Sequence, residues 1–257
     1  MRIDVTGSSD VTGISGGRGA LTFLAVALLA ILPAAALANP GIADGEEFDE
    51  LPSIESLLKR YVEAVGGREA ILALKTRVAS MHIVTDLKRD PPIYEVDTLS
   101  VYGTSSGEFL VVTRTPGGVM LEGCDGDEEW KIDLPGTVFN FHAKDSRDRW
   151  MTDPQFPLKM RHYFPHMAVV GLDVWGGDMV FVVETDGKEL HRLGFDVDTG
   201  LLSRLGYNRE LRDYREVDGV TMPHRVVYSR KGGSSTFVLD SVVHNTAIDR
   251  TLFSLAK

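Results

Sequence analysis

The segment Ala79-Ser80-Met81-His82-Ile83-Val84-Thr85-Asp86-Leu87 decides the fold. Its odd-numbered residues are mostly apolar and alternate with mostly polar ones, a period of two that predicts a β-strand with one buried face. About eleven or twelve segments in all suggest strands in this way. The others are 94–102, 108–114, 119–124, 128–133, 167–174, 179–184, 189–196, 201–207, 212–217, 224–230 and 235–244.

Short turn sequences separate these segments. Ser106-Gly107, Asp125-Gly126 and Gly232-Gly233 are typical of tight hairpin connections. Tight connections join antiparallel strands, whereas parallel strands need long crossovers, and no long helical segment lies between the predicted strands. The strands are therefore expected to form one antiparallel sheet.

A single amphipathic helix precedes the strands. Ser53 is a suitable N-cap, and Gly66-Gly67 is a typical helix end. Between them, apolar residues recur with helical spacing at Ile54, Leu57, Leu58, Tyr61, Val62 and Val65. A second, shorter helical turn is expected at 68–74. The predicted fold is mainly β (α+β): a single curved, unclosed antiparallel sheet, or half-barrel, with helices packed on its concave face.

One stretch, 141–164, has no period of two. It is rich in Arg, Asp, His, Met, Trp and Pro. Residues 146–151 could form a helix, which Pro154 and Pro157 would interrupt. We expect this stretch to cross one face of the sheet in a helical or irregular conformation, and we call residues 141–164 the excursion.

The N-terminal residues suggest export. Residues 1–38 fit a signal peptide: Arg18 precedes an apolar run that ends Ala36-Leu37-Ala38. Cleavage after Ala38 would leave Asn39, not the cysteine of a lipid-anchored protein, at the new N-terminus. The expected location is the periplasm, with no lipid anchor. A membrane anchor is the alternative, but the run falls short of the roughly 20 residues that span a bilayer.

The remaining chain is divided into an acidic linker, 39–52, and one β domain, 53–257. The formal net charge of −10 argues against nucleic acid and anionic membrane surfaces as partners. Cys124 is the sole cysteine, so no intramolecular disulfide can form. No apolar window after residue 38 is long enough for a transmembrane helix, so an integral membrane protein is not expected.

Residues suited to catalysis do not converge in the sequence. His162 and His166 have the i, i+4 spacing of a metal pair, but Pro165 lies between them and favours ordinary surface histidines. The acidic cluster 125–129 lacks the spacing of a calcium loop and is better explained as a hairpin tip. We therefore expect no enzymatic activity, no metal and no cofactor.

Five segments, taken in order, resemble the LolA/LolB-like outer-membrane lipoprotein-sorting proteins. The turn Cys124-Asp125-Gly126-Asp127-Glu128-Glu129-Trp130 is similar to a hairpin of that family. The others are the helix 57–67, the hairpins 195–202 and 213–223, and the end segment 244–249. The resemblance implies a curved sheet around helices, with an apolar cavity between them. It also implies a carrier for a lipid, a lipoprotein acyl chain or another apolar ligand.

The expected ligand site combines strand residues beneath the cavity with apolar residues of the excursion. The alternative is that these side chains fill the core of a non-catalytic structural or interaction module of a cell-envelope or export complex. An envelope or export protein is thus a second candidate partner beside the lipid. The sequence leaves the orientation of Trp130 open. The candidate residues are Met81, Ile83, Phe109, Val111, Trp130, Phe156, Leu158, Tyr163 and Phe164.

Overall fold

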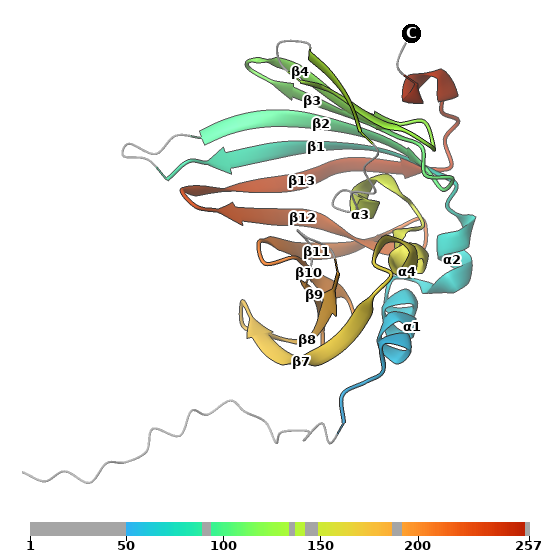
Figure 1. Ribbon diagram of the computed structural model, residues 1–257, viewed down its shortest axis with the longest axis vertical. Coiled ribbons are helices and arrows are strands. Elements are labelled where there is room, and N and C mark those ends of the chain that lie inside the picture. The colour runs from blue at the N-terminus through green and yellow to red at the C-terminus, as the bar shows by residue number, and fades with distance from the viewer. Residues whose placement is uncertain (1–49, 89–93, 134–136, 142–148, 187–191, 255–257) are drawn as a thin grey trace, which may run out of the picture. The chain divides into compact units, whose positions relative to one another are not determined.

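The computed structural model describes residues 50–88, 94–133, 137–141, 149–186 and 192–254 (Figure 1). They belong to one compact unit, 48–257. The predicted signal peptide, its cleavage site and most of the linker lie outside these residues and stay predictions, as do the domain boundaries.

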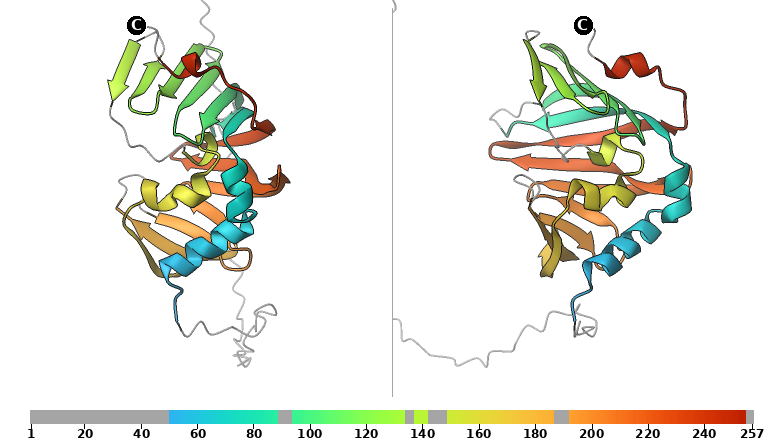
Figure 2. Two further views of the ribbon diagram at one scale, coloured as in Figure 1. Left: turned by 90° about the vertical axis from the view of Figure 1, so that its right-hand side faces the viewer. Right: turned by 45° about the vertical axis from the view of Figure 1, so that its right-hand side comes forward.

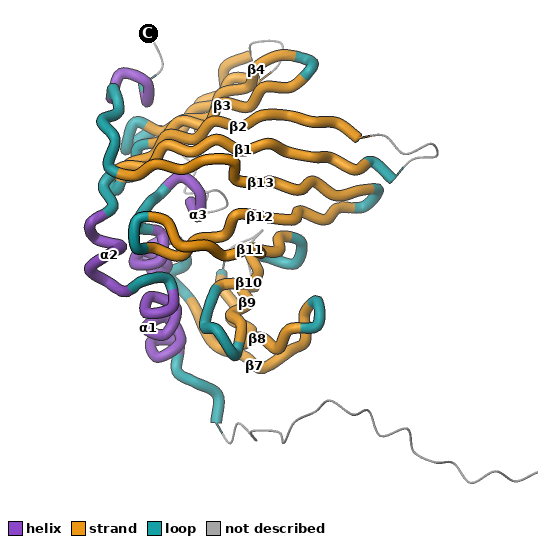
Figure 3. The backbone as a smooth tube through the Cα atoms, turned by 180° about the vertical axis from the view of Figure 1, so that it is seen from behind, coloured by secondary structure: helices purple, strands orange, loops and turns teal. Residues whose placement is uncertain are grey.

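The described strands form one antiparallel sheet of thirteen strands, in the order β6-β5-β4-β3-β2-β1-β13-β12-β11-β10-β9-β8-β7. Neighbours in the sheet are neighbours in the chain except where β1 pairs with β13 (Figure 3). The strands are β1 (Thr76–Asp86), β2 (Tyr94–Thr104), β3 (Phe109–Thr115), β4 (Gly118–Cys124), β5 (Glu129–Asp133), β6 (Thr137–Phe141), β7 (Met167–Trp175), β8 (Asp178–Thr185), β9 (Arg192–Asp196), β10 (Leu202–Leu205), β11 (Arg209–Val217), β12 (Val220–Arg230) and β13 (Gly233–His244).

The sheet is curved and unclosed, as predicted, and β6 and β7 are its two edges. The sequence predicts one strand fewer, because the five residues of β6 closely follow β5 and border the aperiodic stretch 141–164. The connection between β6 and β7 therefore passes from one edge of the sheet to the other. Its described part contains α3 (Arg149–Thr152), the 3-10 helix η1 (Phe156–Lys159) and α4 (Met160–Tyr163).

The predicted N-terminal helix is confirmed as α1 (Ile54–Ala64), followed by α2 (Gly67–Ala73). The Ser53 hydroxyl accepts a hydrogen bond from the Ser56 backbone N–H at 3.1 Å, which makes Ser53 the N-cap. Gly66 lies between the two helices, as the N-cap residue of α2, with a φ of +117°. A Cβ there would lie 2.3 Å from the Gly219 carbonyl oxygen. Glycine thus satisfies both the backbone conformation and the contact with the β11–β12 turn.

The helices lie against the concave face of the sheet (Figure 2). One core cluster joins α1, α2, η1 and α4 to β7–β12, and we call it the α1 cluster. A second joins α3 to β1–β3, β12 and β13, and we call it the α3 cluster. A third lies on the opposite, outer face of β3–β5, where the C-terminal 3-10 helix η2 (Arg250–Phe253) covers it. The residues of the candidate site are distributed among these three clusters.

Candidate functional site

Four predicted site residues come together on the concave face. Met81 and Ile83 on β1 share the α3 cluster with Val111 and Phe109 on β3. Every second residue of β1 is buried, which is the alternation that the sequence predicted. With Met151 from α3, Met81, Ile83 and Val111 are buried in this core, and Phe109 is partly buried against it.

Four others come from the excursion and join the α1 cluster. Phe156 and Phe164 are fully buried, while Leu158 and Tyr163 are partly buried. The rings of Phe156 and Tyr163 stack with their centroids 5.8 Å apart. Phe156 and Phe164 fill the interior between helices and sheet, and Leu158 alone of the four lines an open groove.

Trp130 lies apart from the other eight residues, on the outer face of the sheet. Its indole N–H donates to the Phe253 carbonyl at 2.8 Å. A Cβ on Gly123, its partner on β4, would lie 2.3 Å from the indole ring, so the glycine makes room for the tryptophan. Trp130 therefore anchors the C-terminal segment and does not belong to a site on the concave face.

A buried carboxylate holds the excursion in place. Asp153 accepts hydrogen bonds from the Lys159 ammonium at 2.7 Å, the Tyr163 hydroxyl at 2.5 Å and the Gln155 backbone N–H at 2.8 Å. Burial and the charge of Asp153 raise the pKa of Tyr163, so its hydroxyl stays protonated and donates. Gln155 extends the network to α2, where its amide donates to the Leu74 carbonyl at 2.9 Å.

A second polar connection joins α3 to the sheet. The buried Arg77 donates to the carbonyls of Trp150 and Met151 at 3.2 Å each, and to His244 Nε2 at 3.2 Å. The Nδ1–H of His244 then donates to Asp218, 2.9 Å away. Burial lowers the pKa of Arg77 to about 10. Burial, followed by the charge of Arg77, lowers the pKa of His244.

Neither Arg77 nor His244 was among the predicted site residues. The one available signal is that Arg77 occupies an odd position of the β1 alternation, where an apolar residue is expected. A charged residue in a buried row requires partners, but the sequence does not identify them.

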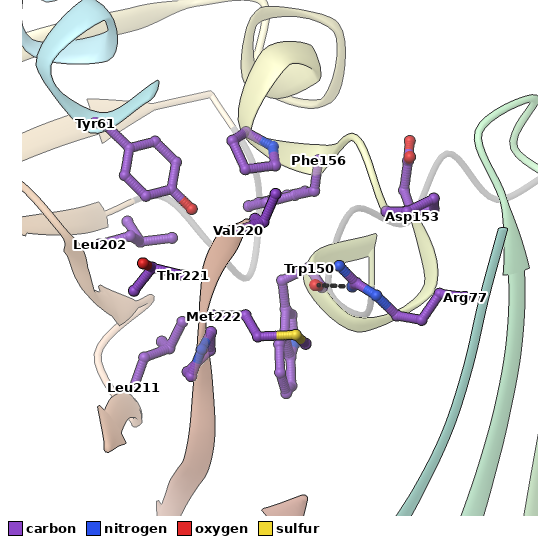
Figure 4. A pocket seen from close by; sticks show the side chains of 13 residues that line it. Tyr61, Arg77, Trp150, Asp153, Phe156, Leu202, Leu211, Val220, Thr221 and Met222 are labelled. Carbon is purple, nitrogen blue, oxygen red and sulfur yellow. Dashed lines mark hydrogen bonds between the residues drawn. The ribbon is translucent and has the colours of Figure 1, made fainter. Parts of the chain in front are cut away.

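The interior cavity beside α1 is small (Figure 4). It measures about 30 Å³ and is lined by Tyr61 from α1, Phe156 from η1 and Val220 from β12, with Arg77 and Trp150 at its far end. A single water molecule needs about 10–15 Å³ of such internal space, so this cavity is far too small for a lipid chain.

A larger, open groove of about 430 Å³ lies between α1 and the η1–α4 segment, and we call it the α1–α4 groove. Its apolar lining is Leu58 and Val62 from α1 with Leu158 and Met160 from the excursion. Its volume lies within the range of small-molecule sites. Pro157 lines both spaces, so η1 is the wall that separates the groove from the interior cavity.

The charged lining of the α1–α4 groove is mostly basic. It consists of Lys59, Glu63, Arg68 and Arg161. Lys59 pairs with Glu63 at 3.9 Å, and Arg161 pairs with Glu55. Apolar lining with charged groups at its border is an arrangement suited to an amphiphile.

The histidine pair considered as a metal site is not arranged as one. His162 lies within α4, whereas His166 follows the helix and lies 3.7 Å from Asp186. Among the described residues, no group of three or more His, Cys, Asp and Glu is placed to hold a metal ion. Each helix within the same residues falls short of the length and hydropathy of a bilayer crossing.

Comparison of the chain with known proteins bears on the fold. No family model matches the sequence, and no curated protein matches it either. A LolA superfamily protein from Nitrosomonas europaea has a similar structure, with a TM-score of 0.53 and 10% identity over 80% of this chain and 99% of that chain. A DUF1329 family protein from Desulfovibrio piger gives a TM-score of 0.52 and 11% identity over 78% and 97%. The chain therefore has the LolA/LolB-like fold that its sequence motifs resemble.

Proposed function

We propose that this protein is an exported carrier that binds one apolar chain, such as a lipid or acyl chain, in the α1–α4 groove. The observation that carries the proposal is the open groove of about 430 Å³, with an apolar lining, on a LolA/LolB-like half-barrel. The predicted signal peptide would place the protein in the periplasm, as a soluble protein without a lipid anchor. No enzymatic activity is expected.

The groove offers a physical reason for binding. Leu58, Val62 and Leu158 are partly exposed in it, so a ligand that covers them removes apolar surface from water. Each square ångström of such surface contributes about 25 cal/mol. Met160 lies at the base of the groove and is itself buried. A flexible methionine adapts to chains of different shape.

A titration with a fluorescent fatty-acyl probe tests the proposal on the purified protein. We expect saturable binding by the native chain and a loss of roughly tenfold or more in affinity for Leu158→Glu, because the substitution brings a charge into the apolar lining. Val119→Glu is the matched control, since Val119 is an exposed apolar residue on β4 outside the groove. Thermal unfolding of both variants establishes that they fold. An absence of saturable binding by the native chain would refute the proposal.

The second candidate is a non-catalytic structural or interaction module. The observation that favours it is the interior cavity of about 30 Å³, because the concave face beside α1 is filled by the protein's own side chains. If this alternative holds, neither the native chain nor Leu158→Glu should bind the probe saturably. The same titration therefore separates the two candidates.

A further inference from the structure

The border of the α1–α4 groove is more basic than the chain as a whole. The protein carries a formal net charge of −10, yet three of the four charged residues that line this groove are cationic. Lys59, Arg68 and Arg161 come from three different helices and border one apolar lining. This local excess of positive charge points to an anionic ligand group.

Two of the three cations have acidic partners that a ligand could replace. Lys59 and Glu63 form a solvent-exposed pair at 3.9 Å, and the Arg161–Glu55 pair is also exposed. Exposed pairs of this kind hold their partners weakly, because water screens the charges. A bound anion can therefore share or displace these carboxylates at little cost.

Arg68 is the third cation and differs from the other two. It is exposed on α2, and within the described part of the chain it has neither a hydrogen-bond nor an ion-pair partner. A guanidinium group presents paired donors that match the oxygens of a carboxylate or a phosphate. Arg68 is thus the cation most available to a ligand head group.

We infer that the α1–α4 groove binds a single-chain anionic amphiphile. The apolar tail lies along Leu58, Val62 and Leu158, and the carboxylate or phosphate lies against Arg68, with Lys59 and Arg161 beside it. This inference rests on the proposed carrier function and adds to it the chemical class of the ligand. The two sources of such a head group are a free fatty acid and a phosphorylated lipid.

Competition against the fluorescent fatty-acyl probe tests the inference with three ligands of equal chain length: dodecanoate, dodecyl phosphate and uncharged dodecanol. We expect one or both anions to bind about tenfold more tightly than dodecanol. A preference for one anion supports the inference and identifies the source of the head group. Added salt should reduce the preference, because the cations are exposed to solvent.

Variants of the groove test which residues produce the preference for the anionic ligands. Arg68→Gln should reduce the preference for the anion about threefold, and the double variant with Arg161→Gln should abolish it, because anion affinity falls more than dodecanol affinity. Arg230→Gln is the matched control, because Arg230 is an exposed arginine on β12 outside the groove. An equal loss from Arg230→Gln would overturn the inference, since the preference would then reflect overall charge.

The outcomes also separate this inference from the carrier function on which it rests. Equal affinity for dodecanol and both anions would overturn the anionic preference and leave the carrier function intact. Failure of all three ligands to displace a bound probe would overturn the inference. Failure of the probe itself to bind would refute the carrier function as well.

Discussion

The two halves of the concave face are held to their helices in different ways. In the α1 cluster, α1, α2 and the η1–α4 segment are fixed to β7–β12 mainly by large apolar side chains. In the α3 cluster, the four-residue helix α3 rests on β2 and β3, and the buried Arg77 donates hydrogen bonds to the carbonyls of its residues Trp150 and Met151. The difference lies in how the helices are attached: apolar packing holds α1, α2 and the η1–α4 segment, whereas α3 is also held by buried hydrogen bonds from Arg77.

The largest expected effect is loss of apolar packing in the α1 cluster. Phe195 is fully buried and contacts Tyr61 edge to face, with ring centroids 5.5 Å apart. Phe195→Ala should lower the free energy of unfolding by about 4 kcal/mol through lost burial and the cavity it leaves. Urea denaturation measures this. Tyr207→Ala, at an exposed position on the same half, should cost less than about 0.5 kcal/mol.

The next largest effect is expected at the buried carboxylate of the excursion. Asp153→Asn removes a charge that Lys159, Tyr163 and Gln155 all contact, and should lower the free energy of unfolding by about 3 kcal/mol. Asp186→Asn is the control, because the Asp186–His166 pair is exposed. If both variants were equally stable, the excursion would not depend on its polar network.

A smaller and more local effect is expected at Gly103. A Cβ at this position on β2 would lie 1.7 Å from the Thr152 carbonyl oxygen, so Gly103→Ala must displace α3. The expected cost is about 2 kcal/mol. Hydrogen exchange should show faster exchange in α3 and unchanged protection in α1. Gly171→Ala is the control, since a Cβ there meets no atom within 4 Å. Equal loss of protection in α1 would show that the substitution destabilises the whole sheet and not the attachment of α3.

The smallest effect is expected from pH. His244 has a lowered pKa in the folded protein, relative to 6.5. The unfolded chain therefore takes up the proton first as the pH falls. The stability contributed by neutral His244 is complete above pH 6.5, and it declines below that value until the folded pKa is passed.

Urea denaturation at pH 8 and at pH 5.5 measures the effect. His244→Gln should lose less stability between these two pH values than the native chain. His162→Gln, at an exposed position, should behave like the native chain. An unchanged pH dependence in His244→Gln would exclude a role for this histidine.

Much of the fold follows from local patterns. The alternation in 79–87, the Ser53 N-cap and the Gly66-Gly67 helix end each appear in the structure where the sequence placed them. These features depend on residues close together in the chain, so a single sequence contains the information. The β6 strand was missed because its short segment directly follows a turn and borders the polar excursion.

The site was harder to predict because it depends on contacts between distant residues. The hydrogen bond from Arg77 to His244 spans 167 positions, and no local pattern indicates it. Trp130 could have pointed to either face of β5, and its contact with Phe253, far away in the sequence, places it on the outer face. The α1–α4 groove brings Leu58 and Leu158 together from separate helical segments. Of the nine predicted site residues, Leu158 is the one that lines this groove.

The most direct test of the carrier account is photo-crosslinking with a diazirine-labelled fatty acid, followed by mass spectrometry of the labelled peptides. We expect crosslinks in α1, at residues 54–64, and in the η1–α4 segment, at residues 156–163, and excess unlabelled dodecanoate should suppress them. Suppressible crosslinks confined to the concave face of β1–β3, or no suppressible crosslinks at all, would contradict a ligand site in the α1–α4 groove.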